Sequence, residues 1–215
     1  MIRIAPSLLA CDFAEMGAAV RAVDTAGADA LHLDVMDGTF VPNISFGLPV
    51  VEALRPHTHL PFDVHLMIVE PERYLERFAK AGADWITVHY EACADPRAAL
   101  TAIRELGCLS GLSIKPGTPP EEILPCLPYC DLVLIMTVEP GFGGQALIPE
   151  CLEKIPYLKR EIARLGLRTV IEVDGGINRK TVAAVRAAGA DILVAGSSVF
   201  GASDMAAAIA ELRDE

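Results

Sequence analysis

The segment LHLDVMDG, which begins at Leu31, carries an imidazole and carboxylates within an otherwise hydrophobic stretch. Side chains alternate between the two faces of a β-strand, so Leu31, Leu33 and Val35 share an apolar face. His32 and Asp34 then lie together on the opposite face. A buried carboxylate without a partner costs several kcal/mol, so this position predicts a partner for Asp34.

Two further aliphatic runs carry the same kinds of side chain, with His65 in FDVHLM and Asp174 in IEVDGG. Imidazole together with carboxylate is a donor set that suits Zn²⁺ or Fe²⁺ better than Mg²⁺ or Ca²⁺. A single His at a strand end is more often a hydrogen-bonded structural residue, and a single Asp is often a helix N-cap. Four such residues favour a metal site if the fold brings them together at one end, as the barrel predicted below would do. The candidate ligands are His32, Asp34, His65 and Asp174.

Glycine-rich segments stand at the ends of three aliphatic runs, one of them the run that carries Asp174: EPGFGGQ ends at Gln145, DGG at Gly176, and AGSS at Ser198. Glycines allow backbone N–H groups to approach an anion, and a helix that starts there adds a favourable dipole. One such turn alone could simply close a connection. Three near one another predict a phosphate site, which would let an acidic chain hold an anion.

Three methionines also stand at or just beyond strand ends, namely Met36, Met67 and Met136. Methionine most often fills gaps in a core. The alternative hypothesis is that these polarisable side chains cover a charged, planar reaction intermediate.

A repeated tetrapeptide indicates the elements that hold these residues. Ala-Gly-Ala-Asp occurs at 26–29, 81–84 and 188–191, each time between an amphipathic stretch and an aliphatic run. Along the sequence, successive copies are separated by about two eighths and about four eighths of the chain length. This spacing favours eight βα units closed into a barrel. An open doubly wound sheet lacks support, because its Gly-rich turn after the first strand is missing. We expect strands at 3–7, 30–34, 62–66, 85–89, 110–115, 132–136, 169–173 and 192–195, with helical stretches such as 71–82 between them.

Composition fits this fold class, an α/β single-domain TIM (β/α)₈ barrel spanning residues 1–215. The chain is 52% hydrophobic and only 6% aromatic, which favours aliphatic parallel strands covered by helices. Its net charge of -11, without a Lys/Arg cluster, argues against a nucleic-acid partner. No signal peptide or membrane-spanning run is recognisable, so we expect no membrane partner and a cytoplasmic location.

The motifs taken together resemble one known family. IAPSLLACDF, HLDVMDGTFVPNISFG, DVHLM, TVHYEA, MTVEPGFGGQ, EVDGGIN and AGSSVFG look like the ribulose-phosphate 3-epimerase family, in order and across nearly the whole chain. The resemblance implies a ribulose-phosphate-binding TIM barrel that interconverts D-ribulose 5-phosphate and D-xylulose 5-phosphate. It also implies a role in the pentose phosphate pathway or the Calvin cycle, a homo-oligomer, and one divalent metal per subunit: Zn²⁺ or Fe²⁺, with Mn²⁺ or Co²⁺ as alternatives.

The resemblance also implies roles for particular residues. Asp34 and Asp174 would form the acid/base pair as well as bind the metal with His32 and His65. The substrate would be bound by Ser7, His65, Gly141, Phe142, Gly143, Gly144, Asp174, Gly175, Gly176, Gly196 and Ser197. Met36, Met67 and Met136 would cover the intermediate.

Inversion of C3 requires proton transfer at both faces of the substrate, and two carboxylates on separate strands could supply it through a metal-stabilised enediolate. Three alternatives stay open. A sister enzyme would act on D-allulose 6-phosphate, a Schiff-base aldolase would use Lys115, and a sugar-phosphate sensor would bind without catalysis.

Overall fold

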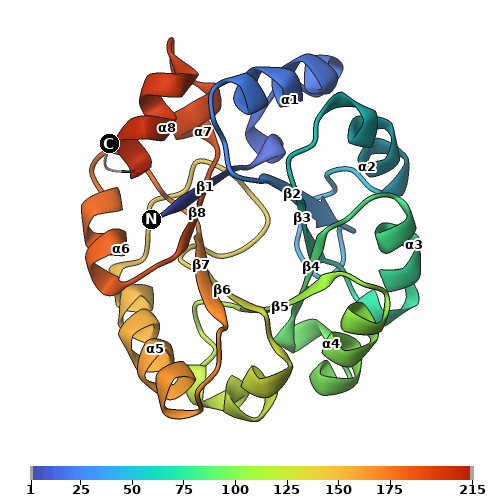
Figure 1. The fold of residues 1–215 in the computed structure, drawn as a ribbon, viewed down its shortest axis with the longest axis vertical. Coiled ribbons are helices and arrows are strands. Elements are labelled where there is room, and N and C mark those ends of the chain that lie inside the picture. The colour runs from blue at the N-terminus through green and yellow to red at the C-terminus, as the bar shows by residue number, and fades with distance from the viewer. Residues whose placement is uncertain (1, 214–215) are drawn as a thin grey trace.

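Eight parallel strands form the centre of the computed structural model, which describes residues 2–213. In the sheet the strands follow the order β1-β8-β7-β6-β5-β4-β3-β2, and helices surround them (Figure 1). A parallel bridge between Ser7 and His32 joins the end of β1 to β2 and closes the barrel. The strands are β1 (Arg3–Pro6), β2 (Leu31–Met36), β3 (Phe62–Met67), β4 (Trp85–His89), β5 (Leu109–Ile114), β6 (Leu132–Met136), β7 (Val170–Asp174) and β8 (Ile192–Ala195).

The connections are helical, as the sequence predicts, but not all of them are α-helices. The stretch at 71–82 divides into a 3₁₀ turn, η4 (Pro71–Arg73), and a short helix, α3 (Leu75–Lys80). Between β5 and β6 the chain forms only 3₁₀ helix, η6 (Pro120–Tyr129), because internal prolines cannot donate α-helical hydrogen bonds. The remaining α-helices are α1 (Met16–Thr25), α2 (Leu48–Leu54), α4 (Pro96–Glu105), α5 (Lys154–Arg164), α6 (Val182–Ala188), α7 (Ser197–Phe200) and α8 (Met205–Arg213).

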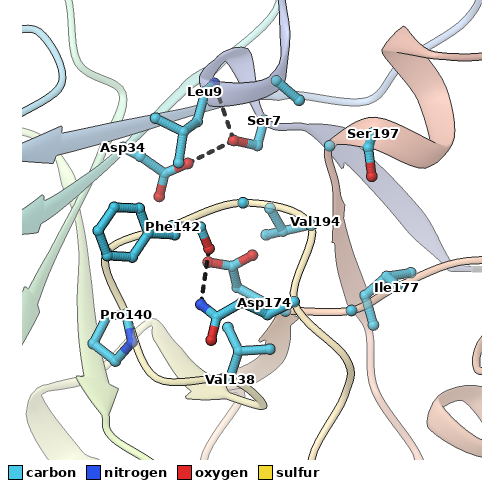
Figure 2. Close-up of a pocket in the computed structure, with 18 of the residues that line it drawn as sticks. Ser7, Leu9, Asp34, Val138, Pro140, Phe142, Asp174, Ile177, Val194 and Ser197 are labelled. Carbon is cyan, nitrogen blue, oxygen red and sulfur yellow. Dashed lines mark hydrogen bonds between the residues drawn. The ribbon is translucent and has the colours of Figure 1, made fainter. Parts of the chain in front are cut away.

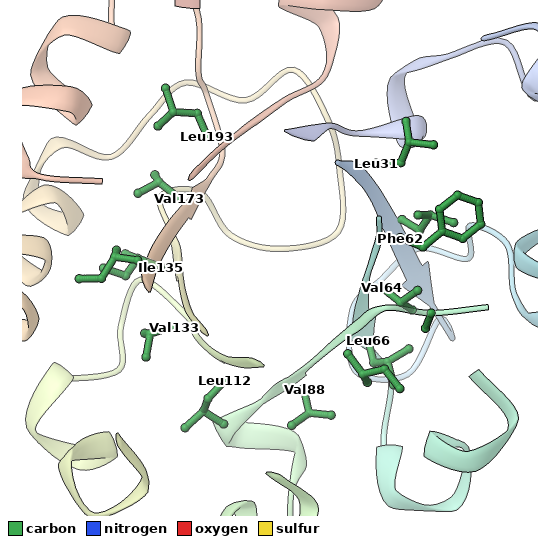
Figure 3. Close-up of a cluster of buried hydrophobic side chains, with 14 of the residues drawn as sticks. Leu31, Phe62, Val64, Leu66, Val88, Leu112, Val133, Ile135, Val173 and Leu193 are labelled. Atoms are coloured by element: carbon green, nitrogen blue, oxygen red, sulfur yellow. The ribbon is translucent and has the colours of Figure 1, made fainter. Parts of the chain in front are cut away.

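The two faces of the barrel wall differ in chemistry. Residues such as Leu31, Val64, Leu112 and Val173 are fully buried and point outward from the strands into the layer beneath the helices (Figure 3). The alternate positions face the barrel interior, where His32 and other polar side chains are equally buried. The apolar outer layer stabilises the barrel, at about 25 cal/mol per Å² of apolar surface removed from water. The interior is thereby free to hold polar groups.

The Ala-Gly-Ala-Asp repeats have a structural role at the end of the barrel where the strands begin. Their glycines adopt positive φ, as expected for the end of a helix, with Gly27 at 87° and Gly189 at 105°. The aspartates accept N–H groups near the start of neighbouring strands; Asp29 accepts from Ile4, the second residue of β1, at 2.8 Å, and Asp191 accepts from Ile171, the second residue of β7, at 2.7 Å. The repeat therefore fixes where strands begin. Within the described residues no helix is long and apolar enough to cross a membrane.

Candidate active site and metal centre

Three donor atoms converge at the C-terminal end of β2 and β3. The distance from Asp34 Oδ1 to His32 Nε2 is 3.2 Å, and that to His65 Nδ1 is also 3.2 Å. The two imidazole nitrogens lie 3.3 Å apart. A carboxylate oxygen of Asp174 on β7 joins them, so that four ligand atoms lie within 4.8 Å of one another. The structure thus brings together the four residues predicted to bind a metal.

Strand register explains this convergence. Asp34 stands beside His65 in the parallel pairing of β2 with β3, and His32 precedes Asp34 by two positions on the same face. Asp174 ends β7 beside Met136 of β6. Because the strands are parallel, their carboxyl ends meet at one end of the barrel.

Serine residues position the Asp34 carboxylate. Ser7 Oγ donates a 2.5 Å hydrogen bond to Asp34 Oδ2 and accepts one from the Leu9 N–H at 3.2 Å (Figure 2). Ser45 Oγ donates to the main-chain carbonyl of Asp34 at 2.5 Å. Asp34 therefore has its Oδ2 atom fixed by Ser7, while Oδ1 faces the imidazoles.

The two aspartates have opposite pKa shifts. Burial opposes ionisation of Asp34, but the charge and hydrogen bonds of His32 and His65 outweigh it and lower the pKa of Asp34. Burial and then the nearby charge of Asp34 raise the pKa of Asp174 to about 7. Two carboxyl groups whose environments separate their pKa values are suited to one basic and one acidic role.

The donor set fits a transition-metal ion. Two imidazole nitrogens and two carboxylate oxygens, all buried or nearly so, converge on one point without a lysine or arginine among them. Zn²⁺ and Fe²⁺ accept such mixed nitrogen and oxygen ligands. Burial of two carboxylates at such short separation is unfavourable unless positive charge compensates it. Metal binding by these four residues is therefore consistent with the observed geometry.

A cavity of about 160 Å³ opens above this cluster, and Asp34 and Asp174 point into it from different strands (Figure 2). Neither His32 nor His65 lines it, because both rings are fully buried within the barrel. The predicted site residues that line the cavity are Ser7, Asp34, Met36, Met67, Met136, Gly141, Phe142, Gly143, Gly144, Asp174, Gly175, Gly176, Gly196 and Ser197.

Close packing fixes the glycine segments on one side of the cavity. Gly176 has a φ of +68°, and a Cβ atom there would meet the backbone nitrogen of Leu147 at 2.4 Å. Thr137 Oγ1 donates to the carbonyls of Asp174 and Gly175. These contacts hold backbone groups of the DGG segment against the loop that follows β6.

The barrel interior contains functional candidates that the sequence reasoning missed. Asp63 Oδ2 lies 2.5 Å from His32 Nδ1, and Glu172 shares a second cluster with both residues. Both carboxyl side chains are fully buried. Burial, followed by the charge of Asp63, raises the pKa of Glu172 well above its usual range. Period-two alternation was the signal, since Asp63 precedes His65 and Glu172 precedes Asp174 by two residues.

Lys115, the candidate Schiff-base lysine, does not line the cavity. Its Nζ atom lies 3.9 Å from the centroid of the Phe40 ring, in a cation–π contact. Phe40 in turn packs on His89, with ring centroids 4.7 Å apart. The amine thus contacts an aromatic ring outside the cavity that holds the aspartates.

Known proteins resemble this chain in both sequence and fold. The family model "Ribulose-phosphate 3 epimerase family" matches residues 3–200. A ribulose-phosphate 3-epimerase of Bacillus subtilis is 51% identical over 214 residues, covering 99% of both chains. One of Synechocystis is 53% identical over 215 residues, covering 99% of this chain and 94% of the relative. The solved structure of KGPDC from Streptococcus mutans superposes with a TM-score of 0.73 at 17% identity, covering 100% of this chain and 96% of that one, which supports the fold alone.

The fold and the site define a (β/α)₈ barrel with a buried His/Asp cluster beneath a glycine-lined cavity. Sequence similarity over nearly the whole chain specifies which barrel this is. The chain belongs to the ribulose-phosphate 3-epimerase family.

Proposed function

We propose that the chain is a ribulose-phosphate 3-epimerase, an isomerase that interconverts D-ribulose 5-phosphate and D-xylulose 5-phosphate by inverting C3. The observation that carries the proposal is the meeting of Asp34, from β2, and Asp174, from β7, in one cavity above a buried His/Asp cluster. Relatives of that name, 51% and 53% identical to the chain, support the same assignment.

Two proton-transfer groups follow from the stereochemistry. A single base returns the proton to the face from which it came, so inversion needs a second group on the other face. Asp34, as a carboxylate, removes the C3 proton, and Asp174, as a carboxylic acid, delivers a proton to the opposite face. The roles exchange in the reverse direction.

His32, Asp34, His65 and Asp174 would hold one divalent metal ion, Zn²⁺ or Fe²⁺, with Mn²⁺ or Co²⁺ as alternatives. When bound, such an ion supplies positive charge that stabilises the negative charge developing on the C2 and C3 oxygens, an effect of several kcal/mol. Asp34 on its own is a weak base for a carbon acid, because the pKa of a free Asp is about 3.9.

Glycine segments would bind the phosphate group. Gly175, Gly176, Gly196 and Ser197 line the cavity, and an anion bound there would accept hydrogen bonds from their backbone N–H groups. The loop of residues 141–144 would cover the sugar, and Asn43 Nδ2 ties that loop to the β2 side by a 2.8 Å bond to the Gly141 carbonyl. Binding of the phosphate anchors C3 between the two carboxyl groups.

The other site assignments are part of the same proposal. Ser7, which lines the cavity, would contact the sugar, whereas His65, also predicted to contact it, does not line the cavity and would act as a metal ligand. Met36, Met67 and Met136 would cover the planar intermediate with apolar, polarisable surface. All three methionines line the cavity and are nearly fully buried, which suits exclusion of water from the reacting carbon. Assembly as a homo-oligomer, a cytoplasmic location and a single catalytic domain over residues 1–215 remain predictions.

The central test uses Asp34→Asn and Asp174→Asn. Each substitution keeps the side-chain shape but removes a proton-transfer group, and general acid–base catalysis contributes about 10² to 10⁴ in rate. Turnover of D-ribulose 5-phosphate, measured in a coupled assay, should fall by at least this factor in both variants. Asp204→Asn, an exposed position outside the cavity, is the matched control and should retain full activity. Near wild-type turnover in either active-site variant would rule out the two-base scheme.

Two further measurements separate the alternatives. Relative turnover on D-allulose 6-phosphate tests the sister epimerase, which we expect to be the slower reaction. Borohydride treatment with substrate would trap an imine on an aldolase, whereas we expect no trapped adduct and loss of activity to a strong chelator.

A further inference from the structure

His65 belongs to a hydrogen-bonded chain that leaves the proposed metal centre in the direction away from Asp34. Its Nδ1 atom faces Asp34, while its Nε2 atom lies 2.8 Å from His89 Nε2. His89 Nδ1 lies 3.2 Å from Glu91 Oε2. Both rings are fully buried and stack with centroids 4.9 Å apart. The order of the chain is therefore Asp34, His65, His89, Glu91.

We propose that Glu91 and His89 are positioning residues that fix the tautomer of His65, so that its Nδ1 atom is free to bind the metal. The proposal rests on the proposed metal site. A ligating Nδ1 atom carries no proton, so the neutral ring of His65 carries its proton on Nε2. His89 Nε2 must then accept a hydrogen bond from that N–H, which places the proton of His89 on Nδ1, facing the Glu91 carboxylate. Every ring nitrogen of His65 and His89 is thereby paired.

The surroundings hold Glu91 in the state that this chain needs. Its second oxygen, Oε1, accepts the main-chain N–H of Lys115 at 2.8 Å and a hydrogen bond from Thr118 Oγ1. Burial of Glu91 opposes its ionisation, but the hydrogen bonds, that of His89 foremost, outweigh it and lower the pKa of Glu91 to about 2. Glu91 is thus an acceptor on both oxygens.

Glu91→Gln is the decisive variant, because the surroundings dictate how its amide is oriented. The Lys115 N–H can only donate, so the amide oxygen takes the Oε1 position and the amide NH₂ faces His89 Nδ1. That nitrogen then becomes an acceptor, and the proton of His89 moves to Nε2. This forces the proton of His65 onto Nδ1, the atom that would bind the metal.

The test measures Zn²⁺ affinity by competition with a chelator and imidazole tautomers by ¹⁵N NMR of the Zn²⁺-loaded protein. Loss of an orienting partner of a metal-bound histidine typically costs 10- to 100-fold in metal affinity, and we expect about that loss in Glu91→Gln. The wild-type spectrum should show His65 protonated on Nε2 and His89 on Nδ1. Thr118→Val removes another hydrogen bond of the same carboxylate, and Glu122→Gln removes a neighbouring charge; both should bind Zn²⁺ within about twofold of wild type.

A double-mutant cycle separates positioning from a general loss of structure. Because Glu91 acts only through His89, Glu91→Gln should have no additional effect on Zn²⁺ affinity in a His89→Phe background. Wild-type affinity in Glu91→Gln, additive losses in the double variant, or the opposite tautomers in the wild-type protein would each overturn the proposal. Failure of the wild-type protein to bind Zn²⁺ would overturn the proposed metal site with it, which is a different pattern from failure of the variants alone.

Discussion

At the scale of single residues, the site depends on which atoms of a side chain are already engaged. Asp34 has one oxygen held by Ser7 and the other turned to two imidazoles. The same division recurs at His32, whose Nδ1 atom faces Asp63 while Nε2 faces Asp34. Asp34 and His32 therefore each present one defined atom to the centre, which reduces the entropy lost when an ion binds.

Gly176 gives a prediction at this scale. In Gly176→Ala the added Cβ atom would meet Leu147 N at 2.4 Å, so the DGG segment must move away from its place in the phosphate site. We expect the KM for D-ribulose 5-phosphate to rise about tenfold or more, as steady-state kinetics would show, since about 1.4 kcal/mol of lost binding gives that factor. Gly166→Ala is the matched control, because Gly166 has a similar φ of +65° but no atom within 4 Å of an added Cβ. An unchanged KM in Gly176→Ala would contradict the phosphate assignment.

At the scale of elements, strand alternation predicts more of the site than motif recognition alone. The sequence shows that the fold is a barrel and that His32, Asp34, His65 and Asp174 lie at one end of it, and the observed strands agree with the expected ranges to within one or two residues. Asp63 and Glu172 lie two positions before His65 and Asp174, away from the strand ends where function is expected, although alternation places both inside the barrel. The hydrogen bond between His65 and His89 depends on side-chain rotamers across neighbouring strands, which sequence does not specify.

Lys154 is another element-scale contact that the sequence does not reveal. From α5 its Nζ atom donates to the carbonyls of Lys115, Pro116 and Thr118, at 2.9, 2.8 and 2.8 Å, and so ties the loop after β5 to the helix layer. Burial lowers the pKa of this amine, and the three carbonyls satisfy its three N–H groups.

We expect Lys154→Met to lower the free energy of unfolding by at least about 1.5–3 kcal/mol, the contribution of one hydrogen bond to a charged group, because three such bonds are lost. Urea denaturation measures this change. Lys180→Met, at an exposed position, should stay within about 0.5 kcal/mol of wild type. Equal stability of the two variants would show that the buried amine does not anchor the loop.

At the scale of the whole molecule, the proposed centre joins strands that are far apart in the sheet order. Its residues come from β2, β3 and β7, and the barrel closes beside it through the Ser7–His32 bridge. An ion bound there would link opposite sides of the barrel and would bind only the folded chain. Residues distant in sequence meet at this point because the sheet closes. Each motif can therefore be recognised in the sequence, whereas the distances between side chains of different motifs require the structure.

Metal binding should therefore stabilise the protein as a whole. At a free Zn²⁺ concentration about 100 times the dissociation constant, the folded state gains about 2.7 kcal/mol, and thermal unfolding shifts upward accordingly. Differential scanning calorimetry of chelator-treated and Zn²⁺-loaded protein measures the shift. Asp34→Asn, which loses one proposed ligand, should show a much smaller shift. Identical melting of the two wild-type samples would count against a metal at this place.

The most direct measurement for the central claim is proton NMR of the metal-loaded protein with D-ribulose 5-phosphate in D₂O. Two-base epimerisation predicts that D-xylulose 5-phosphate appears and that it carries deuterium at C3, because the incoming proton comes from a group that exchanges with solvent. Absence of both product and exchange, with the metal shown to be bound, would contradict the account.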